Sequence, residues 1–450
     1  MEVRVRIAPS PTGVPHIGNT RTALYNYLFC RKNNGKFIIR IEDTDKNRQV
    51  PGSQEKILKI LEFLDLTSDE GPYIQSQRLP IYQKWATKLI KENKAYYCFC
   101  AKERLAKLRI KGHSYDRHCL SLKKGEIADK LASKKYVIRF KIPRNKKIYL
   151  NDLVQGKVEF DANILDDQIL IKSDGFPTYH LAATVDDHLM EISHVIRGVE
   201  WLSSTPKHLL LYQAFGWKPP VFAHLPIILG PDKSKLSKRH GAKSVLDYQD
   251  EGYLPEAIIN FMVFLGWSYK DNSDLLTLEQ LVKIFDLSRV RRANPIFDIK
   301  KLDWFNSQWI KKLTDAELLA RLKPYLTIKL EDKILLKIIP LIKTRIIRLT
   351  QAENLIDFFQ KLPEYNHKPL GPNKEAIQEV KTQLEKLENW SLENIKVTLN
   401  KIIEKNKWDK GKFFMALRVA ITGKTVTPPL LESMEILGKK EILLRLNKAL

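Results

Sequence analysis

The stretch Pro9-Ser-Pro-Thr-Gly-Val-Pro-His-Ile-Gly-Asn19 decides how the first part of this 450-residue chain folds. Residues 2–7 before it alternate apolar and charged side chains, which predicts a short strand that ends where the prolines and the glycine force a tight turn. From Ile17 onward, apolar residues recur at near-helical spacing until Asn33, where a run of helix-stopping residues begins. The pattern therefore predicts a strand, a turn and a helix.

His16 lies at the N-terminus of this predicted helix. Free backbone N–H groups and the positive end of the helix dipole converge at such a position, and Gly18 lets a ligand approach the main chain closely. The local sequence thus favours an anion site, although a Pro-rich turn with a single histidine is equally typical of a surface turn.

A second motif, Gly230-Pro-Asp-Lys-Ser-Lys-Leu-Ser-Lys-Arg-His-Gly241, is polar and rich in lysine and arginine. Alone it is typical of a solvated basic loop. Together the two motifs resemble the HIGH and KMSKS signatures of class I aminoacyl-tRNA synthetases, written here His16-Ile-Gly-Asn19 and Lys235-Leu-Ser-Lys-Arg239.

Three further segments narrow the resemblance to the bacterial glutamyl-tRNA synthetases. They are Arg40-Ile-Glu-Asp-Thr-Asp45, Ser173 through His188, and Val195-Ile-Arg-Gly-Val-Glu-Trp201. The resemblance runs from residue 2 to beyond Arg345 and implies an α/β fold. Its expected parts are a parallel-sheet, Rossmann-like catalytic domain, an α+β acceptor-binding insertion and an all-α C-terminal anticodon-binding region.

The pattern of the chain fits these expected parts. Short β-rich runs alternate with helical runs in the first half, and capping boxes beginning at Thr277 and Thr314 start helices in the second. The pair Thr205-Pro206 predicts the N-cap and first residue of a helix that ends at Gly216. We expect a split catalytic domain over residues 1–78 and 179–239, an insertion over 79–178, a stem-contact domain over 240–312 and an anticodon-binding region over 313–450.

The resemblance implies ATP-dependent attachment of L-glutamate to the 3′ end of tRNA-Glu in two steps, glutamyl-adenylate formation and transfer to tRNA. Neither step needs a protein nucleophile, so catalysis depends on positioning and on stabilising charge at the phosphates. The resemblance makes His16, Lys235 and Lys238 the catalytic residues, and Mg²⁺ enters with ATP. The implied ATP-binding residues are Pro9, Thr12, Gly13, His16, Gly18, Asn19, Lys235, Leu236, Ser237, Lys238 and Arg239.

A glutamate substrate needs a cationic partner for its side-chain carboxylate, and arginine alone offers bidentate geometry. By resemblance the carboxylate partners are Arg6 and Arg197, and Glu42 receives the ammonium group. The remaining implied glutamate-binding residues are Ser10, Tyr179 and Trp201. Without the resemblance, Arg6 would be a solvent-facing strand residue and Glu42 an ordinary salt-bridge partner. Where the family often carries asparagine, this chain has Ala183, which cannot form a side-chain hydrogen bond.

Three of the four cysteines cluster as Cys98, Cys100 and Cys119, which suits a structural Zn²⁺ that needs four ligands. Ligand chemistry favours a histidine as the fourth, and His113 and His118 are near in sequence. Zinc-bearing relatives show Cys-x-Cys followed by Tyr-x-x-x-Cys, so the resemblance implies Tyr115 first and His118 second. The alternative is a set of reduced, metal-free thiols, and Cys30 is most simply a core residue.

The net charge of +24 favours a polyanionic partner, for which tRNA is the natural choice, although a lysine-rich composition alone would also raise the charge. Arg345 matches the arginine that contacts the third anticodon base in relatives selective for tRNA-Glu, and otherwise it would be a solvent-facing helix residue. The few cysteines and the lack of a signal peptide or an 18-residue apolar run predict a cytoplasmic protein without membrane contact. We expect a monomer.

Other interpretations remain open at this stage. The nearest is an enzyme that also, or mainly, charges tRNA-Gln and feeds an amidotransferase. A truncated relative that modifies a tRNA base lacks an anticodon region, which this chain has. A catalytically dead tRNA-binding paralogue would have no reason to keep both phosphate motifs. A small-molecule nucleotidyltransferase would not need a basic helical C-terminal region.

Overall fold

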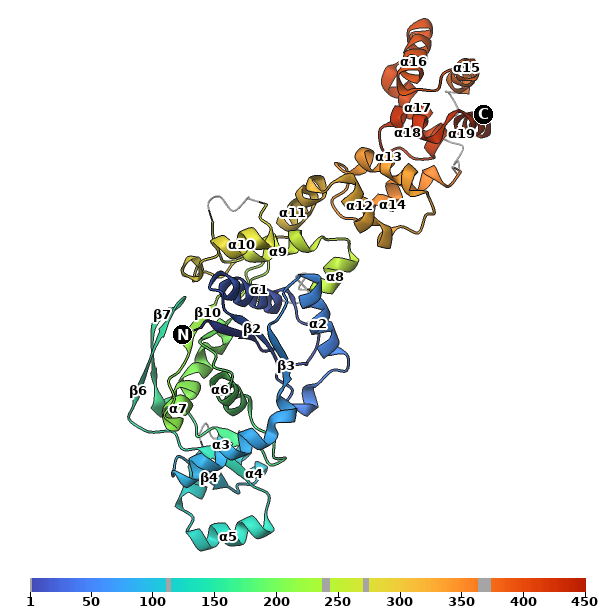
Figure 1. The fold of residues 1–450 in the computed structure, drawn as a ribbon. Helices are drawn as coiled ribbons and strands as arrows, with labels where there is room; N and C mark the ends of the chain where they lie inside the picture. The colour runs from blue at the N-terminus through green and yellow to red at the C-terminus, as the bar shows by residue number, and fades with distance from the viewer. Residues whose placement is uncertain (1, 111–114, 237–242, 270–274, 363–373) are drawn as a thin grey trace. The chain divides into compact units, whose positions relative to one another are not determined.

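The computed structural model describes residues 2–110, 115–236, 243–269, 275–362 and 374–450, shown in Figure 1. The chain forms two compact units. The N-terminal unit comprises Met1–Asp247 and Ile259–Asp298, and the C-terminal unit comprises Tyr248–Ile258 and Ile299–Leu450. No helix in these described ranges is long and apolar enough to cross a membrane.

A parallel sheet forms the centre of the N-terminal unit and confirms the predicted α/β fold. Neighbouring strands pair in parallel in the orders β1-β2-β3 and β9-β10. Ser193, just before β9, donates its N–H to the Arg4 carbonyl at 2.9 Å, so β1 lies beside β9. The strands are β1 (Arg4–Ile7), β2 (Lys36–Ile41), β3 (Glu70–Ile74), β9 (His194–Gly198) and β10 (Val221–Leu225).

The strand order 3-2-1-9-10 reverses its direction between β1 and β9. In open parallel sheets the carboxyl ends of two such strands diverge and leave a crevice for ligands. The helix that follows β1 is α1 (Ile17–Lys32), as predicted, and α7 (Thr205–Phe215) connects β9 to β10. The fold therefore places the first motif of the sequence at the crevice.

Two hairpin strands, β6 (Lys147–Asp152) and β7 (Gly156–Asp161), extend this sheet beyond β10. A separate antiparallel sheet is formed by β4 (Ala95–Cys98), β5 (Val137–Phe140) and β8 (Ile169–Ile171). Phe140 and Leu170 of that sheet share one buried core with Leu181 and Leu211, so it packs on α6 (Tyr179–Leu189) and α7. The remaining helices of this unit are α2 (Ser53–Phe63), α3 (Leu79–Lys91), α4 (Lys102–Ile110), α5 (Lys124–Ser133) and α10 (Leu278–Ile284).

The start of α7 differs from the prediction. The 3₁₀ helix Val199–Ser204 runs directly into α7, and Ser204 occupies the position before it in helical conformation. The first turn of α7 therefore needs no side-chain cap, and the Thr205 hydroxyl is left for other partners. Gly216 ends the helix with φ 73°, as expected of a left-handed terminator.

The C-terminal unit is helical throughout its described residues, as predicted. The box of Thr314 and Glu317 caps α12 reciprocally, and Leu318, Leu319 and Leu322 behind it are buried. Two further helices, α8 (Val245–Asp250) and α9 (Pro255–Val263), contain the points where the chain passes between units. The helices of the C-terminal unit are α11 (Ile299–Lys312), α12 (Asp315–Leu322), α13 (Asp332–Ile342), α14 (Gln351–Ile356), α15 (Lys374–Glu385), α16 (Leu392–Asn406), α17 (Lys410–Thr422), α18 (Leu430–Leu437) and α19 (Lys439–Ala449).

Candidate active site

A pocket opens where the carboxyl ends of β1 and β9 diverge. It holds about 460 Å³ of atom-free space, part of it open to solvent. The start of α1, the end of β9 and the loop after β10 form its walls. Its lining residues are His16, Gly18, Asn19, Arg21, Thr22, Gly198, Glu200, Pro226, Ile227, Ile228, Lys235 and Leu236.

His16 is the N-cap of α1, and its ring folds back onto the helix. Its Nδ1 accepts a hydrogen bond from the Gly18 N–H at 3.0 Å, so the ring proton of the neutral form is on Nε2. Loss of solvent around the ring and the positive charge of Lys235 lower the pKa of His16, which favours this neutral form. The sequence suggested that the Gly18 N–H is free, but the His16 ring occupies it. The ring offers its own Nε2–H to a ligand instead.

The structure brings the second motif to the same pocket. Lys235 pairs with Leu229 across an isolated β-bridge, and the Leu236 N–H donates to the Ile228 carbonyl at 3.0 Å. Lys235 and Leu236 thus line the pocket together with His16. Three other predicted residues of this motif, Ser237, Lys238 and Arg239, lie outside the described residues.

The other predicted ATP-binding residues divide between the pocket and the turn before it. Asn19 lines the pocket. Pro9, Thr12 and Gly13 lie in the turn between β1 and α1, where the Thr12 N–H donates to the Ser10 carbonyl at 2.8 Å and Gly13 has φ 141°.

The charged pocket residues Arg21 and Glu200 are among those that were not singled out from the sequence. Arg21 is buried and donates to the carbonyls of Leu265, at 2.7 Å, and Pro226, so it fastens the wall formed by the loop after β10. The Glu200 carboxylate folds over Gly198, where an added Cβ would lie 2.2 Å from it. Both residues stand within or beside quoted motifs, but their roles depend on contacts that the sequence does not display.

Arg6 and Glu42, two predicted glutamate-binding residues, belong to one buried ionic cluster. Asp187 accepts from Arg6 Nε at 3.0 Å and from Arg40 Nη1 at 2.8 Å, and Arg40 Nη2 donates to Glu42 at 3.0 Å. All four side chains are at most 7% exposed. Arg6 is therefore not a solvent-facing strand residue.

The charges of this cluster are shared unequally. Burial raises the pKa of Glu42 despite the neighbouring charges of Arg40 and Arg6. For Asp187, burial would raise the carboxyl pKa, but the same two arginines hold it below its ordinary value. Of the two carboxyl groups in the cluster, that of Asp187 is therefore the more readily ionised. Neither Nη nitrogen of Arg6 has a hydrogen-bond partner among the described residues, which leaves both for a ligand.

Arg197, the other predicted carboxylate partner, is 5% exposed at the end of β9. Its Nη1 donates to the Tyr179 hydroxyl at 3.0 Å, and the Tyr179 ring lies 4.6 Å from that of Trp201, centroid to centroid. Burial raises the pKa of Tyr179, which also experiences the charges of Arg197, Glu42 and Arg6. The two groups of predicted glutamate-binding residues therefore border one another.

Two further positions complete this region. Ser10 is exposed in the turn after β1, and the neighbouring Pro9 carbonyl accepts the Glu42 N–H at 3.0 Å, which ties the ends of β1 and β2 together. Ala183 lies on α6 and is buried, so this position presents a methyl group and no side-chain hydrogen bond.

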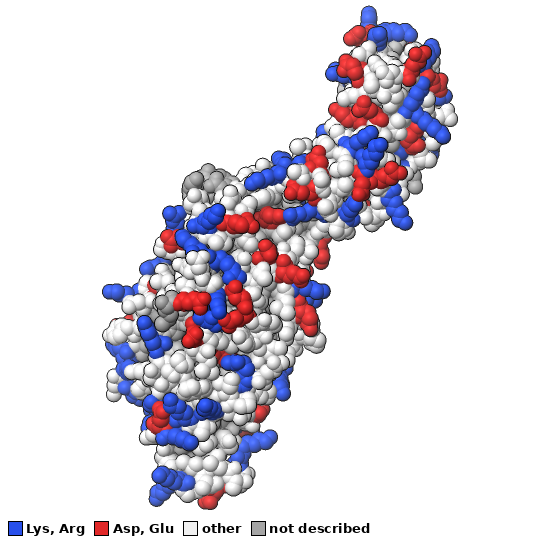
Figure 2. Space-filling model, viewed as in Figure 1, with Lys and Arg blue, Asp and Glu red and all other residues white. Residues whose placement is uncertain are grey.

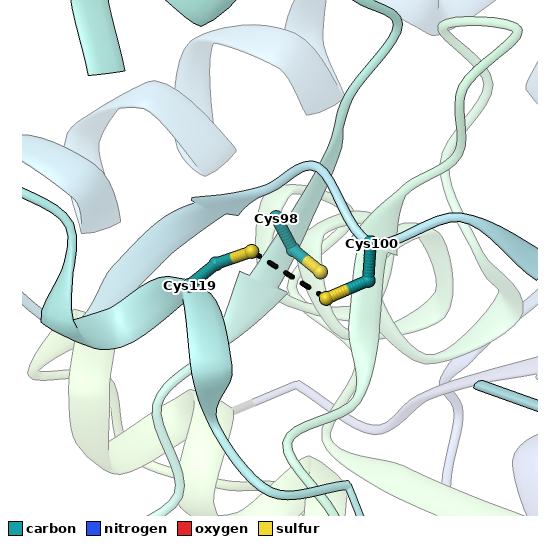
Figure 3. A group of neighbouring side chains, drawn as sticks. All are labelled: Cys98, Cys100 and Cys119. Carbon is teal, nitrogen blue, oxygen red and sulfur yellow. Dashed lines mark hydrogen bonds between the residues drawn. The ribbon is translucent and has the colours of Figure 1, made fainter. Parts of the chain in front are cut away.

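The three clustered cysteines meet in space, as Figure 3 shows. Cys98 ends β4, and the Cys119 sulfur lies 3.5 Å from that of Cys100. All three sulfurs lie within 4.8 Å of one another. The Tyr115 hydroxyl lies 3.3 Å from the Cys98 sulfur and 3.7 Å from the Cys100 sulfur, and the hydrogen bonds from Cys119 and Tyr115 lower the pKa of Cys98.

This geometry fits a tetrahedral metal. A Zn–S bond of about 2.3 Å places two sulfur ligands about 3.8 Å apart, close to the spacing found here. His118 is exposed and does not join the cluster, whereas His113 lies outside the described residues. Tyr115 is therefore the described side chain best placed to be the fourth ligand.

In the C-terminal unit, Arg345 lies just after α13 and is exposed. Its Nη1 is 3.5 Å from the Thr427 carbonyl, which Arg418 Nη1 also approaches at 3.5 Å. Burial and the charge of Arg345 lower the pKa of Arg418. Arg418 Nη1 also bonds to the Thr427 hydroxyl and to the Pro428 carbonyl, the latter at 3.1 Å, so the hydrogen-bond partners of both arginines among the described residues are neutral.

Comparison with known proteins agrees with this architecture. Residues 2–304 match the family model for tRNA synthetases class I (E and Q), catalytic domain, and residues 317–450 match the anticodon binding domain. The chain is 44% identical to a glutamate–tRNA ligase of Dehalococcoides mccartyi strain CBDB1, over 100% of this chain and 97% of that protein. It is 42% identical to the glutamate–tRNA ligase of Borrelia recurrentis, over 100% of this chain and 95% of that protein.

A solved structure extends the likeness to three dimensions. The glutamate tRNA ligase of Elizabethkingia meningosepticum, crystallised in complex with its amino acid, superimposes with a TM-score of 0.92. It shares 38% sequence identity, and the match covers 100% of this chain and 99% of that one. The chain therefore belongs to the glutamate–tRNA ligase family of class I aminoacyl-tRNA synthetases.

Proposed function

We propose that this protein uses ATP to attach L-glutamate to the 3′ end of tRNA-Glu, through glutamyl-adenylate. The observation that carries the proposal is the meeting of both signature motifs at one pocket, where His16 and Lys235 face the same space. Beside it lie two buried arginines suited to a carboxylate, Arg6 and Arg197. An enzyme that adenylates glutamate requires a phosphate site beside a site that holds the glutamate side-chain carboxylate.

In the first step the glutamate α-carboxylate attacks the α-phosphorus of ATP, and pyrophosphate departs. His16 Nε2–H and the start of α1 stabilise the charge that builds on the α-phosphate. Lys235 and Lys238 hold the departing pyrophosphate oxygens. Mg²⁺, carried on the ATP phosphates, supplies further positive charge when bound. In the second step the terminal ribose hydroxyl of tRNA takes the glutamyl group and AMP leaves.

The glutamate-binding roles follow from charge and position. Arg197 and the free Nη groups of Arg6 bind the side-chain carboxylate of glutamate, and Glu42 binds its ammonium group. Tyr179 and Trp201, whose rings lie against each other beside Arg197, form an aromatic wall of the site. Ser10 lies at the turn where the glutamate and ATP sites meet. Ala183 adds apolar surface rather than a hydrogen bond.

The test is attachment of radiolabelled glutamate to purified tRNA-Glu and, separately, to tRNA-Gln, with glutamine as the control amino acid. We expect glutamate on tRNA-Glu and no attachment of glutamine. Charging of both tRNAs, or of tRNA-Gln alone, would assign the protein to the pathway that makes glutaminyl-tRNA indirectly. Charging of neither would contradict the proposal.

We further propose that residues 313–450 bind the anticodon, that 240–312 contact the tRNA stem and that 79–178 contact the acceptor end. Unpaired bases are bound by hydrogen bonds and stacking, for which the Arg345 and Arg418 pair is suited. Figure 2 shows Lys and Arg spread over the visible face, with Asp and Glu among them, so charge alone does not locate the tRNA. Replacing Arg345 by glutamine should weaken discrimination between tRNA-Glu and tRNA-Gln, and unchanged discrimination would remove Arg345 from this role.

The cluster of Cys98, Cys100, Cys119 and Tyr115 is proposed to hold a structural zinc ion. Protein purified without chelator should contain close to one zinc per chain, and Cys119→Ser should lose it. Less than a tenth of an equivalent in the unmodified protein would contradict the proposal. Unbridged cysteines at all four positions suit the reducing cytoplasm, where we propose that the protein acts. Sedimentation should give the mass of a monomer, 52.3 kDa.

A further inference from the structure

Asp152 and His224 form a buried pair behind Arg197. Asp152 lies on β6 and His224 on β10. In the sheet β10 lies between β6 and β9, and His224 is in register with Arg197 of β9. His224 Nδ1 lies 2.6 Å from Asp152 Oδ2, and both side chains have 0% exposed area. Asp152 Oδ1 accepts the backbone N–H groups of Val154, Gln155 and His224 at 2.8 to 3.1 Å.

The partners of the ring determine where its proton lies. Arg197 Nε is 3.1 Å from His224 Nε2, and an arginine can only donate. His224 Nε2 must therefore accept, and its Nδ1–H donates to Asp152. The Thr205 hydroxyl also lies 3.1 Å from Nε2 and can either donate or accept, so it does not change this assignment. The neutral ring in this tautomer is the form that satisfies Arg197 and Asp152 together. Burial lowers the pKa of His224, which keeps the ring neutral even though Asp152 acts in the opposite direction.

The remaining partners of Arg197 are neutral as well. Its Nη2 donates to the Thr205 hydroxyl at 2.9 Å and approaches the Trp201 carbonyl at 3.4 Å. Its Nη1 donates to Tyr179 and lies 3.5 Å from His208. Within the described part of the chain, no carboxylate forms an ion pair with Arg197. A buried guanidinium is normally paired with an anion, so this one is held in place without being neutralised.

We propose that Asp152 and His224 are positioning residues of the glutamate site: the neutral His224 ring fixes Arg197 and keeps the Asp152 carboxylate away from it, so that the charge of Arg197 is available to the substrate carboxylate. The inference rests on the proposed role of Arg197. The weak contacts of Arg197, at 3.4 and 3.5 Å, are those that a carboxylate would replace.

The experiment measures the KM for glutamate, the KM for ATP and kcat in aminoacylation with saturating tRNA. His224→Ala removes the acceptor, and we expect the glutamate KM to rise about 10- to 100-fold, the range for losing a hydrogen bond to a charged group. The ATP KM should stay within about twofold. In an Arg197→Ala background, His224→Ala should add almost nothing, because both changes act through the same guanidinium.

Asp152→Asn is a second variant, chosen because asparagine has nearly the same size and shape as aspartate. Its Oδ1 can still accept the three backbone N–H groups, but its amide presents N–H to His224 Nδ1 and moves the ring proton to Nε2, which then opposes Arg197 Nε–H. A rise in glutamate KM similar to that of His224→Ala is expected. Asp167→Asn is the matched control, since Asp167 is 1% exposed and has no contact with Arg197.

The outcomes separate the two levels of the proposal. If Arg197→Ala raises the glutamate KM while His224→Ala and Asp152→Asn leave it within about twofold, Arg197 keeps its role and the positioning pair is refuted. If Arg197→Ala leaves the glutamate KM unchanged, both are refuted. Equal rises in the KM for glutamate and ATP, or an equal effect of Asp167→Asn, would mark general damage to the fold and refute the pair.

Discussion

Replacing Gly18 by alanine should impair catalysis without harming the fold. Gly18 is the second residue of α1 and has ordinary helical backbone, so alanine is accepted there. Its gain of up to about 1 kcal/mol in helix propensity offsets the loss of the His16 cap, and stability should stay within about 1 kcal/mol. The added Cβ, however, would lie 2.8 Å from Cε1 and 3.0 Å from Nδ1 of the His16 ring. Carbon atoms pack at about 3.5 to 4.0 Å, so the ring must move by about 1 Å.

That displacement breaks the hydrogen bond between the Gly18 N–H and His16 Nδ1 and moves Nε2 away from the phosphate position. A misplacement of about 1 Å in a catalytic group can cost about 10²-fold in rate. We therefore expect tRNA-dependent ATP–pyrophosphate exchange to fall about 100-fold. Thermal denaturation of the same preparation should show a midpoint within about 3 °C of that of the unmodified protein, because the gain in helix propensity and the loss of the cap nearly cancel.

Gly125→Ala is the matched control. Gly125 is likewise the second residue of a helix, α5, but an added Cβ would meet nothing within 4 Å. A double variant with His16→Ala tests the route of the effect, because Gly18→Ala should add little once the ring is gone. Full additivity would mean that the methyl group blocks ATP directly, and normal exchange in Gly18→Ala would refute the assigned geometry of His16.

Three further predictions concern other residues. Lys238→Ala should reduce pyrophosphate exchange about 10²- to 10³-fold in folded protein, whereas Lys233→Gln in the same loop should not. Burial and the charges of Lys207 and Arg197 lower the pKa of His180 to about 4, so the unfolded chain gains this proton first as pH falls. Stability is then lost between about pH 6.5 and 4. The free energy of unfolding, measured in urea, should fall between pH 7 and pH 5, and this fall should be about 2 kcal/mol smaller in His180→Gln than in the unmodified protein. Gly252→Ala should destabilise the C-terminal unit by about 2 kcal/mol or more, because Gly252 has φ 87° and an added Cβ would lie 2.7 Å from the Leu349 nitrogen. The control is Gly438→Ala, at φ 82° with open space around the added Cβ, which should lower the thermal unfolding midpoint less.

Local signals in the sequence predicted the elements that depend on neighbouring residues. The strand, turn and helix around His16 form as expected, because alternation, turn residues and a stop signal all act within a few positions. The capping boxes at Thr277 and Thr314 also form. The cap expected at Thr205 is wrong, because the preceding 3₁₀ helix supplies the first turn and the Thr205 hydroxyl binds Arg197 instead.

The residues that orient the predicted site could not be found in this way. Asp187 reaches Arg6 from 181 positions away, and Asp152 reaches His224 from 72. Nothing in the spacing of single residues indicates which buried aspartate will face which arginine, because that depends on the order of strands in the sheet. The motif residues could be predicted from the resemblance to a known family. Their hydrogen-bond partners could be identified only from the arrangement of the strands in the structure.

The two arginines proposed to receive glutamate differ in a way that bears on specificity. Arg6 is already paired with Asp187, so its net contribution to the local charge is small. Arg197 has only neutral partners in the described structure, and it therefore carries the positive charge that a third carboxylate in this buried region requires. Glutamine has the shape of glutamate but brings no charge, and it would leave Arg197 buried and uncompensated, at a cost of several kcal/mol. If Arg197 receives the substrate carboxylate as proposed, the neutral tautomer of His224 contributes to discrimination against glutamine, because an anion in its place would neutralise Arg197 before any substrate arrived.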